Sequence, residues 1–116
     1  MYEIRYYKNT RGDSPVAEFI DKLGLKSKVK VFRYLENLEA YGPLLPRPYA
    51  DYLRDKIYEL RVTHGRLSIR ILYFFVKGKI IVLTSGFLKK KDKVDKREIE
   101  TAVNRMNDYL KRHRGG

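Results

Sequence analysis

The chain has 116 residues, enough for one compact domain with a core of its own and too few for two comfortable ones. Hydrophobic residues make up 43% of it and no low-complexity tract interrupts them, which excludes a disordered chain. Twenty-six Lys and Arg against fourteen Asp and Glu leave a formal charge of +12, an excess that attracts polyanions. We therefore expect a single domain, residues 1–116, with a polyanionic partner.

Nucleic acid is the first candidate for that partner, because the basic residues lie among ten Tyr and five Phe whose rings can stack on bases. The alternative is a basic chain whose charge serves only solubility. The absence of Cys excludes disulfides and thiolate chemistry. No apolar run is long enough to cross a membrane and the chain does not begin like a signal peptide, so we expect a cytoplasmic protein that does not contact a membrane.

The first half of the chain predicts a strand followed by two helices. Residues Tyr2 to Lys8 favour the strand, and Ser14 with Pro15 is typical of a helix start that leads to a stop at Gly24. Apolar residues at spacings of three and four then predict an amphipathic helix over residues 25–41. The two prolines between Leu44 and Tyr52 exclude a regular helix there, and we expect an extended loop.

The second half predicts three strands and a last helix. Runs rich in Ile, Val, Leu, Tyr and Phe place the strands at residues 56–63, 67–77 and 79–87, with tight turns between them that make them antiparallel. The middle strand is apolar on both faces, as a central strand is. A helix begins near Asp95, and the apolar face of this helix comprises Ile99, Ala102, Val103, Met106 and Leu110. A basic tail, residues 111–114, follows the helix.

This order predicts an α+β fold: a small, mostly antiparallel sheet with two N-terminal helices and a C-terminal helix. We expect the helices to cover one face of the sheet and to leave the other partly open as a cleft.

Two arginines, Arg61 and Arg70, lie inside predicted strands, where charges are uncommon. A guanidinium on a rigid strand can bind a phosphate through two oxygens and stabilise the extra charge of a phosphorane-like transition state. The alternative is a structural arginine that pairs with Glu59 or Asp55 or reaches solvent along its aliphatic stem.

A basic run follows the last predicted strand and contains Lys89, Lys90, Lys91 and Lys93. Clustered ammonium groups make it easier for one of them to lose its proton, so the run could supply a general base; the alternative is a solvated charge run. Phe87 and Tyr73 could stack a base beside the scissile phosphate, although core packing is the commoner fate of such rings.

Other chemistry is weakly supported by the sequence. His64 lies in a His-Gly turn and is more typical of a loop residue than of an acid or base. No His or carboxylate pairs have metal-ligand spacing, so we predict neither a metal site nor a cofactor.

Three ordered blocks resemble the phage-derived, HigB-like branch of the RelE toxin superfamily: Leu53 to Arg61, Arg70 to Phe74, and Gly86 to Lys90 before a C-terminal helix. The resemblance also includes the opening strand and Ser14-Pro15-Val16 and spans nearly the whole chain. It implies a RelE-like fold and a type II toxin that cleaves messenger RNA in the ribosomal A site by attack of the ribose 2′-hydroxyl, without a metal.

The same resemblance implies roles for single residues. Arg61 and Arg70 match the family's phosphate-binding arginines, and Lys89 and Lys90 match its basic pair, one for proton transfer and one for charge stabilisation. The catalytic Tyr that some relatives carry in the last helix has no counterpart in residues 98–101. We expect further RNA contacts from Lys56, Arg66, Tyr73, Phe87, Lys91 and Lys93.

The implied partners are the ribosome with its messenger RNA and a cognate antitoxin, a helix-turn-helix protein from an adjacent gene. Operator DNA would be bound only through the antitoxin complex. Two other functions remain open from the residues alone: a module that binds RNA or DNA without cutting it, and an interaction protein that docks an acidic partner.

Overall fold

The computed structural model describes residues 1–113, so Arg114 of the expected basic tail lies outside the described residues. The chain folds as an α+β domain whose elements follow the predicted order with one additional strand. In chain order they are β1 (Glu3–Tyr6), α1 (Pro15–Asp21), α2 (Leu25–Tyr41), the 3-10 turn η1 (Gly42–Leu44), β2 (Ala50–Arg54), β3 (Ile57–His64), β4 (Leu67–Val76), β5 (Ile80–Leu88) and α3 (Lys96–Arg112).

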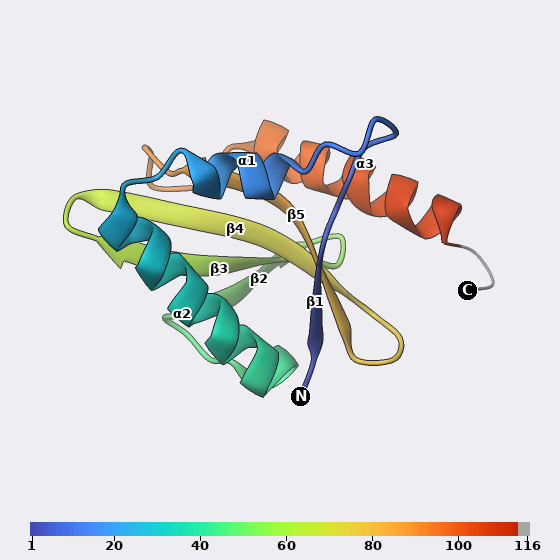
Figure 1. Ribbon diagram of the computed structural model, residues 1–116, viewed down its shortest axis with the longest axis horizontal. Coiled ribbons are helices and arrows are strands. Elements are labelled where there is room, and N and C mark those ends of the chain that lie inside the picture. Colours follow the sequence, from blue (N-terminus) through green and yellow to red (C-terminus); the bar gives the residue numbers. More distant parts are fainter. Residues whose placement is uncertain (114–116) are drawn as a thin grey trace.

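The five strands form one mixed sheet in the order β1-β5-β4-β3-β2 (Figure 1). β1 pairs with β5 in parallel, while β2, β3, β4 and β5 pair with their neighbours in antiparallel fashion. The longest strand, β4, lies at the centre of the sheet. The three predicted antiparallel strands are therefore confirmed, and β4 has the central position that its two apolar faces indicated.

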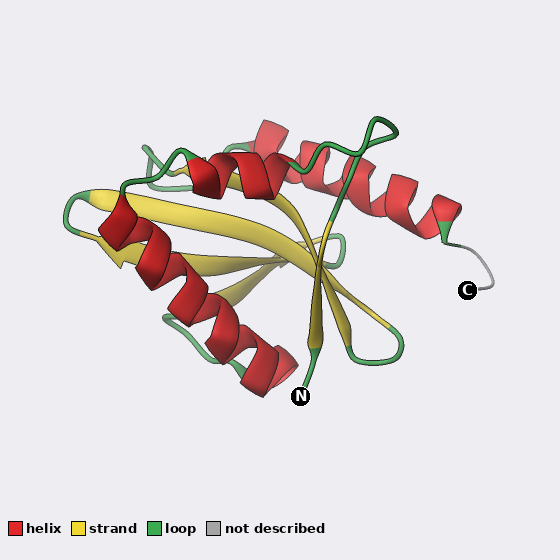
Figure 2. Cartoon of the chain, viewed as in Figure 1, coloured by secondary structure: helices red, strands yellow, loops and turns green. Residues whose placement is uncertain are grey.

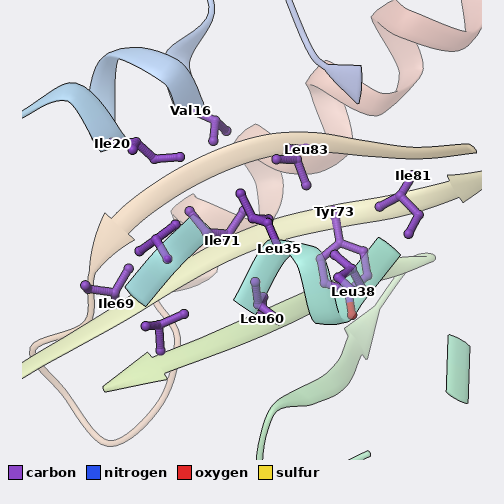
Figure 3. Close-up of a cluster of buried hydrophobic side chains, with 12 residues drawn as sticks. Val16, Ile20, Leu35, Leu38, Leu60, Ile69, Ile71, Tyr73, Ile81 and Leu83 are labelled. Atoms are coloured by element: carbon purple, nitrogen blue, oxygen red, sulfur yellow. The ribbon is translucent and has the colours of Figure 1, made fainter. Parts of the chain in front are cut away.

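The helices cover both faces of the sheet, which corrects the expectation that they share one face (Figure 2). α1 and α2 pack on one face, where Val16, Leu35 and Leu38 meet Ile71 and Leu83 of the strands (Figure 3). α3 packs on the other. Alternate residues of β4 point to opposite faces, and because both sets are apolar, each face needs a cover.

The face under α3 forms a second, smaller core. Leu72, Phe74 and Val82 of the strands are buried there against Ala102 and Met106 of the helix. The buried stripe of α3 also contains Tyr109, whereas Leu110, which we expected inside, is 43% exposed. None of the helices within residues 1–113 is long and apolar enough to cross a membrane.

The predicted starts of α1 and α3 are confirmed, and a side chain caps each of these helices. The Ser14 hydroxyl accepts a hydrogen bond from the Ala17 N–H at 3.2 Å, with Pro15 at the first helical position of α1. The Asp95 carboxylate accepts from the Arg97 N–H at 2.8 Å and so fixes the point at which α3 leaves the β5–α3 loop.

The expectation of an extended loop from Leu44 to Tyr52 is wrong for its last residues, which belong to β2. The prolines end before Ala50, and Asp55 and Lys56, both with positive φ, form a two-residue turn that joins β2 to β3 as a hairpin. This turn lacks glycine, which is why the sequence pattern did not reveal it.

Candidate active site

A cluster of charged side chains lies on the face of the sheet that α3 covers, but beyond the apolar contacts of that helix. Asp51 of β2 lies opposite Glu59 of β3, and Arg61 of β3 lies opposite Arg70 of β4. The pleat puts these residues on the same face as Leu72, nearer the β3–β4 hairpin, where α3 does not extend (Figure 1). The candidate site therefore lies on rigid strands.

The two arginines face one another across the β3–β4 ladder, an arrangement that repulsion disfavours. The carboxylate of Glu59 offsets this repulsion between the two guanidinium groups. Its Oε2 accepts a hydrogen bond from the Arg61 Nε at 2.9 Å, and its Oε1 lies 3.1 Å from the Arg70 Nε. Arg61 also binds Asp51, with 3.2 Å between Nη2 and Oδ2. One buried carboxylate thus holds two guanidinium groups in register.

The contact between Arg70 and Glu59 is ionic but is not aligned as a hydrogen bond. Neither the Arg70 Nε nor the Glu59 Oε1 has a hydrogen-bond partner among the described residues, although both atoms are buried. Buried polar atoms in this condition are uncommon and costly in folded proteins, and they often mark functional positions.

Arg70 is buried and pairs with Glu59, as the structural alternative considered from the sequence expected. Only 8% of the residue is exposed, and its Nη1 donates to the Ser68 hydroxyl at 3.0 Å and to the Ile69 carbonyl at 3.1 Å. Burial, together with the nearby Arg61, lowers the pKa of the guanidinium, while Glu59 raises it. Arg61 is the more accessible of the two, since about a third of its side chain (32%) is exposed.

A pocket of about 200 Å³ adjoins this cluster at the end of β5. Phe87, which pairs with Arg70 across the β4–β5 ladder, forms one wall. Ser68 joins the two regions, because its hydroxyl accepts from Arg70 and its carbonyl accepts from the Lys89 N–H at 2.7 Å. The basic residues that line the pocket are Lys89, Lys90, Lys91 and Lys93.

Glu98, in the first turn of α3, lines the same pocket and was missed by the sequence analysis. Burial and then the neighbouring Asp95 raise the pKa of its carboxyl, while Arg105 lowers it. A carboxyl group that holds its proton more strongly than usual can take part in proton transfer. The available signal was an acidic residue three positions after Asp95, near which the helix was predicted to begin, and just beyond the lysine run.

Two expected RNA-binding residues, Lys56 and Tyr73, do not join this site. Lys56 lies in the β2–β3 turn, at the opposite end of the sheet from the lysine pocket. Arg66 is exposed in the β3–β4 turn, at the same end as the charged cluster, but does not line the pocket. Tyr73 is 1% exposed, and its ring stacks on Tyr58 at 5.7 Å, so the expected stacking of Tyr73 on a base is wrong. The pleat of β4 directs Tyr73 to the α2 side of the sheet, where it belongs to the core.

His64 has a local partner in the fold. Its Nδ1 lies 2.7 Å from the Ser27 hydroxyl of α2 and so ties the end of β3 to that helix. Within residues 1–113, no three His, Asp or Glu side chains converge where they could hold a metal ion.

A comparison with known protein families places the chain in one of them. A comparison with curated proteins gave no match. Residues 18–107 match the family described as "Phage derived protein Gp49-like (DUF891)". This stretch runs from α1 into α3 and includes the charged cluster and the lysine pocket. The chain therefore belongs to the phage-derived Gp49-like family, a RelE-like, toxin-like family.

Proposed function

We propose that the chain is the toxin of a type II toxin–antitoxin pair, of the HigB-like kind, and cleaves messenger RNA in the ribosomal A site. The observation that carries this proposal is the pair of strand arginines that share buried Glu59 beside a lysine-lined pocket. The family supports the toxin assignment, and the formal charge of +12 suits an RNA substrate.

The proposed reaction is attack of a ribose 2′-hydroxyl on the adjacent phosphorus. A bond forms between phosphorus and the 2′ oxygen while the bond to the 5′ oxygen breaks. One group accepts the 2′-hydroxyl proton and another protonates the leaving 5′ oxygen, so the products are a 2′,3′-cyclic phosphate and a 5′-hydroxyl. The transition state carries extra negative charge on the phosphate oxygens, which fixed cations stabilise.

Arg61 is the guanidinium that we assign to the phosphate, because part of its side chain is exposed. Buried Arg70 acts as a positioning residue: it holds Glu59, and Glu59 holds Arg61. Proton transfer falls to one of Lys89 and Lys90, with the other stabilising charge, and Glu98 is a second group for proton transfer in the same pocket.

Three further residues in or next to the lysine-lined pocket are assigned to RNA contacts by their positions there. Lys91 and Lys93 are exposed next to the pocket and would bind the RNA backbone, while Phe87 offers a half-buried ring for a base. Codon choice would come largely from the ribosome, and the protein would reside in the cytoplasm with its substrate.

The test is induction of the chain in a bacterial host, followed by mapping of RNA ends. Wild type should arrest growth and leave 2′,3′-cyclic phosphate ends in translated messages. Arg61→Ala should lower the single-turnover cleavage rate on programmed ribosomes about 100- to 1000-fold, as loss of a transition-state donor does. Arg33→Ala, an exposed arginine of α2, is the matched control and should leave the rate unchanged.

Other outcomes would refute the proposal. New 3′-hydroxyl ends would contradict attack by the 2′-hydroxyl. Tight binding to RNA or ribosomes without any new ends would favour the non-cutting binding module instead. Arg61→Ala must keep the thermal midpoint near that of wild type, which separates loss of chemistry from loss of fold.

A further inference from the structure

A second cavity, of about 750 Å³, opens between the C-terminal half of α3 and the end of the sheet that carries the β2–β3 and β4–β5 turns. It is separate from the candidate active site. Lys77 at its rim follows the end of β4, seven residues from Arg70, which corresponds to about 23 Å along a strand.

The lining of this cavity includes an apolar floor. Val76 and Ile80 are half-buried beside the β4–β5 turn, Met106 of α3 is 6% exposed, and Leu110 is 43% exposed. This floor continues the core that α3 forms with the sheet, so a second apolar surface could extend that core. A concave apolar surface with an exposed leucine is typical of a docking site.

The charged residues that line the cavity are all basic. Arg5 and Arg112 have local partners: the Arg5 Nε lies 2.6 Å from the Glu3 carboxylate and the Arg112 Nη2 lies 2.7 Å from that of Asp108. Lys56 and Lys77, at the tips of the two turns, make no ion pair with another side chain of residues 1–113. The rim therefore offers positive charge that acidic groups of a partner could neutralise.

We propose that this surface, the α3 groove, binds an acidic amphipathic helix of a partner protein. Apolar residues on one face of that helix would contact the floor, and its Asp and Glu residues would lie against Lys56 and Lys77. Under the proposed function, on which this identification rests, the partner is the antitoxin.

The floor favours a peptide over RNA as the occupant. Two of the rings in the lining, Phe74 and Tyr109, are 1% and 6% exposed, so neither offers a face on which a base could stack. Half-buried Phe75 packs with the α2-side core, edge-on to Tyr58 and Tyr73. The exposed His113 ring already stacks on Tyr109 at 4.0 Å. The exposed apolar side chain in the lining is that of Leu110, which suits leucine-like side chains of a partner. A partner bound here would leave Arg61 uncovered, because that residue does not line the groove.

The test uses a synthetic helix of Leu and Glu with leucines at i, i+3, i+4 and i+7, titrated into the full chain and followed by fluorescence anisotropy. A peptide of the same composition with scrambled spacing measures attraction by net charge alone. Wild type should bind the amphipathic peptide at least 10-fold more tightly than the scrambled one. Leu110→Glu and Lys77→Glu should each weaken amphipathic binding at least 10-fold.

The matched controls are Leu25→Glu and Lys26→Glu, both at exposed positions of α2 on the other side of the sheet, which should change binding less than 3-fold. Equal binding of the two peptides, or equal loss with the control variants, would overturn the proposal. Weaker binding of the groove variants to single-stranded RNA, with peptide binding unchanged, would make the groove an RNA surface and also overturn it. Failure of the proposed function would appear in the cleavage assay, which does not involve the peptide, so the two failures are distinguishable.

Discussion

Removal of the negative charge of Glu59 should be strongly destabilising. The residue is 2% exposed and is the counter-ion of two arginines that face one another across the sheet. Glu59→Gln keeps the size of the side chain but leaves Arg70 buried without its carboxylate. Breaking a buried ion pair by neutralising one partner costs about 3 kcal/mol or more.

The expected shift follows from the length of the chain. Unfolding entropy of about 2.1 cal/mol/K per residue gives roughly 0.24 kcal/mol/K for 116 residues, so a loss of about 3 kcal/mol lowers the thermal midpoint by about 12 °C. The midpoint is measured by circular dichroism at neutral pH. Glu36→Gln, an exposed residue of α2, is the control and should change the free energy of unfolding by less than about 0.5 kcal/mol.

A double variant tests the cause of that loss. If the cost of Glu59→Gln is the unpaired charge of Arg70, adding Arg70→Met should recover at least half of it, because both charges are then gone. A shift for Glu59→Gln no larger than that for Glu36→Gln, or strictly additive losses in the double variant, would show that the cluster is not coupled in the way the distances indicate.

Three further outcomes follow from the structure. The pKa of Glu98 is raised in the fold, so ionisation of its carboxyl costs stability as pH rises through that pKa. Glu98→Gln should therefore raise the thermal midpoint above that of wild type, and by more at pH 7 than at pH 3. A difference between the two midpoints that does not depend on pH would argue against this reasoning. A Cβ on Gly86 would lie 2.5 Å from the Phe19 ring, so Gly86→Ala should lower the unfolding free energy by about 1 to 3 kcal/mol in urea titrations, whereas an unchanged value would mean that the ring moves freely. Binding to single-stranded RNA should weaken as salt rises, and Lys91→Gln with Lys93→Gln should reduce the log–log slope by about 1.4; a flat salt response would rule out phosphate contacts.

The order of the elements followed from local patterns in the sequence. The strands around β4 and the start of each capped helix depend on residues a few positions apart, such as Ser14 and Pro15, and these were predicted. The location of α3 on the opposite face depends on which surface remains uncovered after α1 and α2 have packed. β2 depends on pairing with β3 through a turn without glycine, so neither feature was visible in a local pattern.

The candidate site was predicted as a set of residue types but not as an arrangement. Arg61 and Arg70 were singled out because charges inside strands are uncommon, and the fold places them opposite one another. Their different exposure was not predictable, because it depends on the strand order: Arg70 lies on central β4, between β3 and β5, whereas Arg61 lies on β3, next to the edge strand β2. Tyr73 was misassigned because its exposure is set by which face the pleat gives it, and the sequence alone did not assign that face to a helix.

This difference in exposure changes how the site should be tested. Truncating an exposed arginine would cost little stability, but Arg70→Ala removes the partner of buried Glu59 and disturbs Arg61 through it. A loss of activity in that variant would not separate chemistry from folding. Arg61, which is held by the same carboxylate but reaches solvent, separates the two, and Arg70→Lys adds a second check because it keeps the charge while losing the planar donors. If Arg70 positions and Arg61 binds the phosphate, Arg70→Lys should retain part of the cleavage rate that Arg61→Ala loses.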